Sequence, residues 1–213
     1  MLETHAEHFE TTKAEEKDTA RLEAFSDGVF AVAITLLALD LKVPPVGSTG
    51  TARDLVEALL RQWPGYLAFV TSFLTVLIMW LNHHVLFKLV GRTSTQLMFA
   101  NGFLLLMTTA VPFTTELVSA YASRPGARVA AGVYGGAFVL ISIGYLWIWE
   151  AVKRGRLFRR DASERTIERI NRSYRYGTPM YLLATLGAFL SAHVTLGICT
   201  ALWLFWAFTA TEC

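Results

Sequence analysis

The sequence predicts an all-α integral membrane protein with six transmembrane helices. Hydrophobic residues make up 54% of the 213 residues and charged residues only 17%, whereas a soluble domain usually carries about 25% charged residues. Several apolar runs reach the length of about 20 residues that a helix needs to cross a bilayer. Loops rich in proline, glycine or basic residues separate these runs. A chain of this length has room for five to seven such spans and no large soluble domain, and the apolar runs predict six.

The expected elements begin with a polar N-terminal tail over residues 1–20. This tail lacks the apolar segment of a signal peptide and is predicted to be disordered or loosely helical, so the first span is expected to serve as a signal anchor. A membrane domain over residues 21–211 follows. Its six predicted spans cover residues 21–41, 64–89, 95–121, 126–152, 174–193 and 196–211.

Local features support these boundaries. Prolines and glycines over residues 43–51 predict a loop, and residues 53–62 predict a short amphipathic helix outside the membrane. Pro64 suits the first turn of the second span, where its missing N–H costs nothing. Pro112 is expected to kink the third span. The very short link between the last two spans predicts an antiparallel hairpin.

The basic residues predict the orientation of the chain. Six spans place both termini on one side, and that side carries fourteen Lys and Arg residues against five on the other. Because cytoplasmic loops are enriched in basic residues, both termini are expected to be cytoplasmic, in a multi-pass protein of the cell membrane. The same rule accounts for the basic segment over residues 153–175, so no nucleic-acid partner is expected. Glu164 and Glu168 make this segment too polar for a voltage sensor that crosses the bilayer, and contact with anionic lipid headgroups is the preferred interpretation.

Enzymes and resident cofactors are not indicated. The two cysteines, Cys199 and Cys213, form neither a disulfide framework nor a metal site. Phosphate-cradling glycine loops, nucleophile elbows and His-Glu-x-x-His motifs are absent from the sequence. We therefore expect neither a catalytic residue nor an organic cofactor nor a bound structural metal.

Polar residues open the first span, where charge is costly. Residues 21–28 read Arg-Leu-Glu-Ala-Phe-Ser-Asp-Gly, and a charge at mid-membrane costs roughly 2.5–3.5 kcal/mol on insertion scales. The second span returns to the same side through Trp80-Leu81-Asn82-His83-His84, at a similar depth. We expect a hydrogen-bonded cluster that positions the first helix. Its predicted members are Arg21, Ser26 and Asp27 from the first span, with Asn82 and His83 or His84 from the second.

Of two other interpretations of this cluster, one stays open and one is disfavoured. A proton relay through Asp27 and the histidines remains an alternative. A metal shared by His83 and His84 is disfavoured, because adjacent residues on a helix point about 100° apart.

A stripe of residues along the first span suggests a pore. Phe25, Gly28, Val32, Thr35, Leu36 and Leu39 recur at spacings of three and four, on one helix face. Bulky aliphatic side chains arranged around a pore would form a constriction, and the oxygen of a single hydroxyl would bind a partly dehydrated cation. Ordinary helix packing, with Thr35 bonded to the carbonyl four residues back, explains the same spacing.

The motifs resemble those of the transmembrane protein 175 family, which comprises lysosomal potassium channels and their prokaryotic relatives. The resemblance rests on the Arg-x-x-x-Phe-Ser-Asp-Gly octad, the threonine-containing stripe and the Trp-x-Asn-His-His segment, in that order. It implies a single six-span unit that assembles as a homotetramer, with the first helix of each subunit lining a central pore. It also implies a hydrophobic constriction at Val32, Leu36 and Leu39, with Thr35 aiding selectivity. Val32 is smaller than the residue often found at that layer.

The expected function is therefore a potassium-permeable cation channel that conducts potassium passively through a hydrophobic constriction. The alternative is a proton-coupled secondary transporter or proton channel that uses Asp27 and the histidines of the second span. The residues expected to form the structural motif and pore-helix network are Arg21, Phe25, Ser26, Asp27, Gly28, Trp80, Asn82, His83 and His84.

Overall fold

The computed structural model describes residues 2–44, 50–121 and 124–211, and every regular element in these ranges is helical. Side chains are described from Lys17 onward, except those of Asp40, Pro64, Trp203 and residues 208–211. The fold is therefore all-α, as the sequence predicts. The elements are α1 (Leu2–Leu36), the 3₁₀-helix η1 (Leu37–Asp40), α2 (Ala52–Arg61), α3 (Trp63–Lys88), α4 (Thr95–Thr109), α5 (Val111–Tyr121), α6 (Ala127–Arg154), α7 (Glu164–Leu186), the 3₁₀-helix η2 (Gly187–Phe189) and α8 (Ala192–Thr211).

Four helical segments in the described residues are long and apolar enough to cross a membrane. They cover Lys17–Leu39, Gly65–Lys88, Thr95–Tyr121 and Ala127–Arg154, which overlap the first four predicted spans. The apolar part of α8 is shorter, at Ala192–Ala207, and the first half of α7 is rich in charged residues. Several helices of this kind identify a multi-pass membrane protein.

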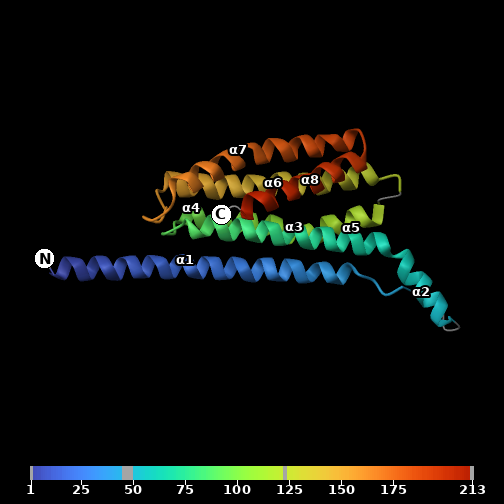
Figure 1. The fold of residues 1–213 in the computed structure, drawn as a ribbon, viewed down its shortest axis with the longest axis horizontal. Helices are drawn as coiled ribbons and strands as arrows, with labels where there is room; N and C mark the ends of the chain where they lie inside the picture. Colours follow the sequence, from blue (N-terminus) through green and yellow to red (C-terminus); the bar gives the residue numbers. More distant parts are fainter. Residues whose placement is uncertain (1, 45–49, 122–123, 212–213) are drawn as a thin grey trace.

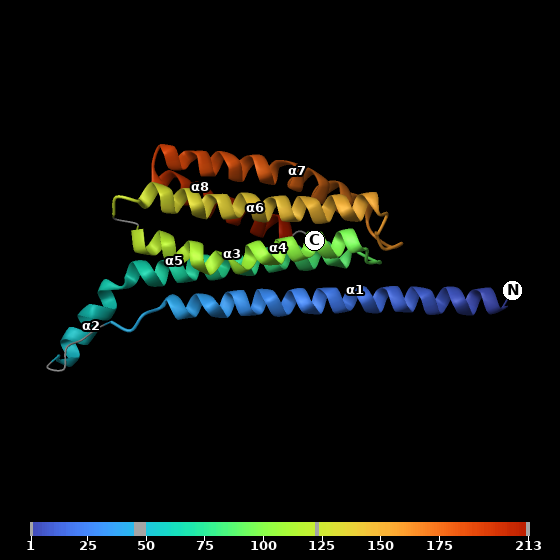
Figure 2. The same ribbon diagram turned by 180° about the vertical axis from the view of Figure 1, so that it is seen from behind.

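The helices form a bundle in which α6 holds the central place and α1 lies at one edge (Figures 1 and 2). α6 contacts α4, α5, α7 and α8, whereas α1 contacts mainly α3 and α4. Gly144 allows the close approach of α6 to α4, because a Cβ atom there would lie 3.1 Å from the Cα of Leu104. The core continues through the fully buried side chains of Ile148 and Trp149.

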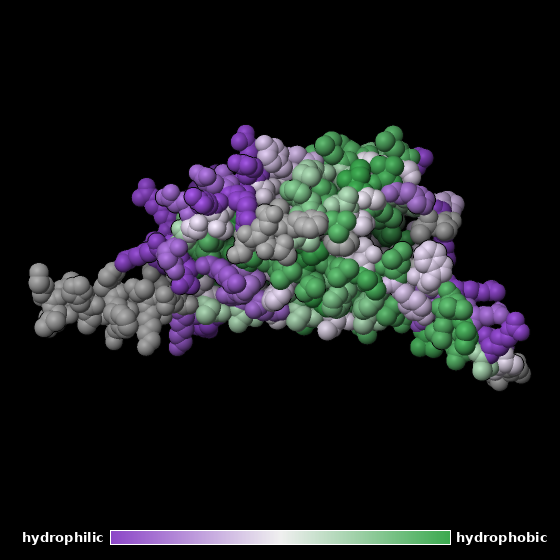
Figure 3. Space-filling view, viewed as in Figure 1, coloured by the Kyte–Doolittle hydropathy of each residue, from purple (hydrophilic) through white to green (hydrophobic). Residues whose placement is uncertain are grey.

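The basic loops gather at one end of the bundle. A two-bond bridge joins the turn after α3 to the loop after α6, since the Gly91 N–H donates to Leu157 O at 2.8 Å and the Arg159 N–H to Leu89 O at 2.9 Å. The N-terminal half of α1 lies at this end, and α2 projects from the opposite end (Figure 1). Figure 3 shows hydrophilic side chains concentrated at the basic end and apolar ones over the middle of the bundle.

The first helix is longer than the predicted first span. α1 starts at Leu2 and continues through the segment expected to be a disordered or loosely helical tail. That segment contains several Ala, Glu and Lys residues and no Gly or Pro, so helix propensity favours continuation. At its other end α1 tightens into η1 from Leu37 to Asp40.

Of two further boundaries, the interruption of the third span lies next to the proline expected to kink it, whereas the last hairpin differs from the sequence-based expectation. The third apolar segment is divided at Ala110 into α4 and α5, two residues before Pro112, because proline cannot donate to the preceding turn. The hairpin between α7 and α8 lies at residues 187–191, earlier than predicted from the link after residue 193. Ser191 supports a helix start there, because its hydroxyl accepts from the His193 N–H at 3.2 Å.

Candidate functional site

The first helix presents two different faces. The side that faces the bundle carries Ser26, Phe30, Ala33 and, just after the end of α1, Leu37. Each of these residues is at most 1% exposed. Their spacing of four, three and four residues follows one side of an α-helix. This buried face is held by polar contacts to α3 and α4, which form two separate groups.

The Ser26 network links α1, α3 and α4 in the interior. The Ser26 hydroxyl donates to Leu22 O at 2.8 Å, and the Asn101 amide donates to Ser26 Oγ at 2.9 Å. Asn101 Oδ1 lies 2.9 Å from His83 Nε2. An amide oxygen only accepts hydrogen bonds, so His83 must donate through Nε2. The direction of every bond in the Ser26 network is therefore fixed.

His83 is fully enclosed in this network. Its ring stacks on Phe87 at a centroid distance of 4.2 Å and lies 5.3 Å from the ring of Phe30. The other ring nitrogen, Nδ1, is buried and has no hydrogen-bond partner among the described residues. A buried imidazole in apolar surroundings with one bond made serves to fix the packing of α3 against α1 and α4.

The Asp27 pair and the Glu23 pair join α1 to α3 at a second place. The Trp80 indole N–H donates to Asp27 Oδ1 at 2.8 Å, and His84 Nδ1 lies 2.8 Å from Glu23 Oε1. The rings of Trp80 and His84 stack at 5.8 Å, so the two pairs support each other. Hydrogen bonds to charged groups contribute about 1.5–3 kcal/mol each, which makes these pairs effective clamps between α1 and α3.

The structure brings together five of the nine predicted network residues and leaves four outside, two of which, Phe25 and Gly28, lie on the exposed face of α1. Ser26, Asp27, Trp80, His83 and His84 all bridge α1 to its neighbours. Arg21 does not join them: its side chain is 78% exposed and lies 4.0 Å from Asp18. Asn82 also lies elsewhere, because it donates to Ile78 O at 2.8 Å and lines a cavity on the opposite side of α3.

Sequence reasoning missed Glu23 and Asn101. Glu23 lies four residues before Asp27 and thus on the same face of α1, a spacing that could have indicated its role. Asn101 is the polar residue in an otherwise apolar part of α4, and an amide in a membrane span is a recognisable signal. The pairing of Asn101 with Ser26 requires the helix packing, which the sequence pattern does not contain.

The candidate pore stripe lies on the opposite face of α1, away from the bundle. We define it as Phe25, Gly28, Val32, Thr35, Leu36 and Leu39, all of which are exposed in the single chain. The large apolar members of the stripe are 40–75% exposed. Packing within one subunit therefore does not account for the stripe.

Thr35 keeps its hydroxyl at the surface of this stripe. The hydroxyl donates to Val32 O at 2.8 Å, three residues back rather than four. Since the proton is used toward the helix, the oxygen lone pairs remain available as an acceptor for a cation. Leu36 ends α1 and Leu39 belongs to η1. In a 3₁₀-helix, residues three apart eclipse each other, so Leu39 is expected to lie almost directly above Leu36.

The residues of this site offer no arrangement for a bound metal. Among the described residues, no group of three or more His, Cys, Asp or Glu side chains could hold an ion. His83 faces Asn101 and His84 faces Glu23, so the adjacent imidazoles diverge toward different helices.

Known proteins resemble this chain along most of its length. A family model described as that of the endosomal/lysosomal potassium channel TMEM175 matches residues 21–112, a range that includes the Ser26 network, the Asp27 and Glu23 pairs and the candidate pore stripe. A potassium channel of Chamaesiphon minutus is 45% identical over 194 residues, which is 91% of this chain and 95% of the relative. A potassium channel of Streptomyces collinus is 42% identical over 196 residues, or 90% and 92% of the two chains.

The fold has a close match among solved structures. The crystal structure of a lysosomal potassium-selective channel TMEM175 homolog from Chamaesiphon minutus has a TM-score of 0.78 and 42% sequence identity. The match covers 92% of this chain and 99% of that chain.

Proposed function

The chain belongs to the TMEM175 family, and from that premise we propose that it is a potassium-permeable cation channel. It conducts potassium passively across a membrane, down the electrochemical gradient. Two relatives that match about nine-tenths of the chain carry the name potassium channel, and the family is one of channels rather than enzymes. Potassium is the permeant species, and no cofactor takes part.

The observation that carries this proposal is the two-faced first helix. One face of α1 is buried and clamped by the Ser26 network and the Asp27 pair, while the candidate pore stripe is left exposed and apolar. A row of large apolar side chains without a partner in its own subunit is covered either by lipid or by other copies of the chain, and the Thr35 hydroxyl within this row favours other copies. Four copies around an axis would place the stripe at the centre of a homotetramer, with α1 lining the pore.

In this assembly the constriction is formed by Val32, Leu36 and Leu39, and Thr35 contributes to selectivity. The distance from Val32 to Leu39 is about 12 Å, given one α-helical turn followed by a tighter 3₁₀ turn. Layers of four apolar side chains offer no oxygen atom to replace the water that the ion loses. Four Thr35 hydroxyls at one level add the acceptors that a partly dehydrated potassium ion requires.

We further propose six membrane spans with both termini in the cytoplasm. α7 and α8 add the fifth and sixth spans to the four longer apolar helices, and their hairpin brings the chain back to the basic end. The fourteen basic residues expected at that end favour a cytoplasmic location under the positive-inside rule. The host membrane is the cell membrane.

The geometry gives little support to a proton relay through Asp27. Its hydrogen-bond partner among the described residues is the Trp80 indole, which is a donor only and cannot accept a proton to pass on. The histidines contact Asn101 and Glu23, so among the described residues no hydrogen-bonded chain leads from Asp27 to either imidazole.

A flux measurement tests the function directly. Purified protein in liposomes is expected to carry a potassium current that reverses with the potassium gradient and persists when the pH is equal on both sides. Liposomes without protein and liposomes with a sodium gradient serve as controls. Transport that strictly requires a proton gradient would reject the channel proposal in favour of a proton-coupled carrier.

A further inference from the structure

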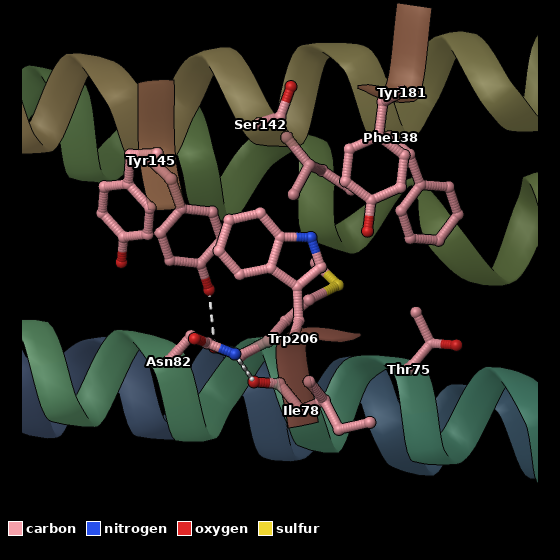
Figure 4. A pocket seen from close by; sticks show the side chains of 11 residues that line it. Thr75, Ile78, Asn82, Phe138, Ser142, Tyr145, Tyr181 and Trp206 are labelled. Carbon is pink, nitrogen blue, oxygen red and sulfur yellow. Dashed lines mark hydrogen bonds between the residues drawn. The ribbon is translucent and has the colours of Figure 1, made fainter. Parts of the chain in front are cut away.

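A groove runs along the outer surface of the bundle between α4 and α6, which lie side by side (Figure 2). Its main lining residues are Thr95, Phe99, Gly102, Phe103 and Leu106 of α4 and Trp147 of α6. Trp147 lies two residues after Tyr145 and therefore points to nearly the opposite side of α6. Tyr145 lines the internal cavity shown in Figure 4, so the α4–α6 groove opens to the outside of the chain. We propose that this groove binds one anionic phospholipid, with an acyl chain along α4 and the phosphate at the basic end of the bundle.

The α4–α6 groove has the dimensions of an acyl chain in one leaflet. From Thr95 to Leu106 it extends about 16 Å along α4, which is roughly half of the hydrocarbon thickness of a bilayer. Because α4 begins at the basic end of the bundle, this half is the leaflet at that end. The volume of the groove is about 620 Å³. A methylene group occupies about as much space as a liquid water molecule, roughly 30 Å³, so the groove holds one chain of roughly 16–18 carbons.

Aromatic residues and a glycine shape the groove. The ring of Phe103 lies 5.8 Å from that of Trp147, at an interplanar angle of 54°, so the two rings form an apolar wall between the helices. At Gly102 a Cβ atom would meet nothing within 4 Å, which leaves space beside this wall. Phe99 and Leu106, one turn before and one turn after Gly102, are both well exposed. An acyl chain that lies over Gly102 would therefore contact apolar side chains along its length.

Basic side chains lie at the end of the groove where the headgroup belongs. Arg154 lies seven residues after Trp147, on the same face of α6 and about 10 Å closer to the basic end. Its side chain is 74% exposed, and its Nε atom lies 3.6 Å from Glu150 Oε2. Lys153 Nζ lies closer to the same carboxylate, at 2.6 Å. Two basic groups therefore share one carboxylate, which leaves positive charge for an anionic ligand.

Arg156 adds a third basic group in an unusual backbone conformation. Its φ of 50° lies in the left-handed region, where helix ends usually place glycine and other residues are strained. The end of α6 imposes this φ, since the Arg156 N–H donates to Lys153 O at 3.1 Å and the Leu157 N–H to Val152 O at 3.0 Å. The Arg92 guanidinium in turn donates to Arg156 O at 3.0 Å. Because the Arg156 side chain is exposed, packing does not offset the strain, which points to a role for its guanidinium outside the chain.

The chemistry of this end favours an anionic lipid over a zwitterionic one. The guanidinium groups of Arg92, Arg154 and Arg156 can each donate two parallel N–H bonds to phosphate oxygens. They would also repel the ammonium group of a choline headgroup. Phosphatidylglycerol, whose phosphate is its only charged group, fits these residues. The inference uses the apolar spans Thr95–Tyr121 and Ala127–Arg154 and does not depend on which ion the protein conducts.

The probe for this proposal is dioleoyl phosphatidylglycerol, with dioleoyl phosphatidylcholine as the comparison. Each lipid is titrated into the purified full-length protein in detergent, and native mass spectrometry counts the lipids bound per chain. We expect one phosphatidylglycerol per chain to bind at least about tenfold more tightly than phosphatidylcholine, because several arginines act on its phosphate. Equal affinities for the two lipids would overturn the proposal.

Arginine variants locate the headgroup. Arg154→Gln is expected to weaken phosphatidylglycerol binding by about fivefold. Arg172→Gln is the matched control, because it removes the same charge from an exposed position of α7 at the basic end and should leave the binding unchanged. Equal losses in the two variants would show general attraction to a positive surface and reject the site.

Arg156→Gly separates a role in lipid binding from a role in the fold. Glycine relieves the backbone strain, so we expect the thermal unfolding temperature to stay the same or rise, while phosphatidylglycerol binding weakens by about fivefold. A variant that binds phosphatidylglycerol as tightly as the unmodified protein would contradict the role assigned to Arg156.

A glycine variant tests the path of the acyl chain. Gly102→Leu fills the groove and is expected to weaken the binding of both lipids at this site by roughly tenfold. Gly197→Leu on α8, where a Cβ atom also meets nothing within 4 Å, should change neither. If Gly102→Leu dissociates the assembly and leaves lipid binding unchanged, a second copy of the chain covers the groove and the proposal is wrong. If Gly102→Leu fails to fold, the exposed arginine variants still decide the outcome.

Discussion

At the residue scale, Thr35 carries the hydroxyl of the candidate pore stripe, and its oxygen remains accessible although its proton bonds Val32 O. We predict that Thr35→Val, which keeps the side-chain shape nearly constant, lowers the preference for potassium over sodium. The physical reason is the loss of four acceptor oxygens at one level of the pore. Reversal potentials measured in mixed potassium and sodium solutions provide the readout.

Thr35→Ser is the matched control, because it keeps the hydroxyl and removes only a methyl group. It should retain most of the potassium preference. If Thr35→Val leaves the reversal potentials unchanged, Thr35 is a packing residue and the selectivity assignment is wrong.

A second residue-scale prediction concerns Asp27. Its carboxylate accepts the Trp80 indole N–H in a partly buried place between α1 and α3. We expect Asp27→Ala to strand this donor at a cost of about 1–3 kcal/mol, and thus to lower thermal stability and tetramer yield. Thermal unfolding followed by size-exclusion chromatography measures both. Ion selectivity of any surviving channels should stay unchanged.

Asp27→Asn provides the comparison for this prediction, since it keeps an oxygen acceptor for Trp80 and removes the charge. We expect it to recover much of the stability that Asp27→Ala loses. A stable Asp27→Ala tetramer with altered ion preference would instead assign Asp27 to ion coordination.

At the element scale, the end of α1 determines the shape of the constriction. The change from α-helix to 3₁₀-helix after Leu36 brings Leu39 almost into line with it. We predict that Leu36→Ala or Leu39→Ala raises single-channel conductance, because each widens a ring of four apolar side chains. Leu183→Ala on α7, where the side chain is 67% exposed and far from α1 in sequence, serves as a control. Unchanged conductance in both pore variants would move the constriction elsewhere.

A further element-scale prediction concerns the start of α2. The Asp54 N–H donates to the Thr51 hydroxyl, and the Thr51 N–H and hydroxyl donate to the Asp54 carboxylate. The two bonds that the carboxylate accepts from Thr51, the backbone N–H bond first and the hydroxyl bond second, lower the pKa of Asp54 below its ordinary value of 3.8. The ionised carboxylate therefore stabilises the start of α2 at a pH above 3.8. This stabilisation is lost as the pH falls below 3.8 and through the lowered pKa of Asp54.

We expect the mobility of a spin label at Ala58 to rise in this acid range. In Thr51→Ala the label should already be more mobile at neutral pH, because a lost cap costs about 1 kcal/mol, or roughly fivefold in the opening equilibrium. A label whose mobility does not depend on pH would show that α2 is held by other contacts.

The helix pattern explains which parts of this arrangement were predictable from sequence. That the residues of the candidate pore stripe share one face follows from their spacing alone, because a face of one helix is a local property. Their assignment to a pore comes from the family resemblance. The positions of Asn82 and Asn101 depend on how helices rotate against one another: successive residues on α3 differ by about 100°, so Asn82 and His83 face different neighbours. The early start of α1 and the hairpin at residues 187–191 were missed because propensity and capping set helix ends only weakly.

At the scale of the whole molecule, the exposed face of α1 makes the assembly testable. The proposed homotetramer should have a mass of about four times the 23.7 kDa of one chain, which native mass spectrometry measures. In such a ring the four copies of Leu39 approach one another at the axis, whereas Leu183 on α7 lies at the periphery. We therefore predict that Leu39→Cys forms disulfide-linked dimers on mild oxidation and that Leu183→Cys does not. The native cysteines are first replaced by serine. Because Cys199 is buried, size-exclusion chromatography must show that the protein with these replacements still assembles.

Cross-linking at residue 183 without cross-linking at residue 39 would place α1 on the outside of the assembly, and the candidate pore stripe could then not line a central pathway.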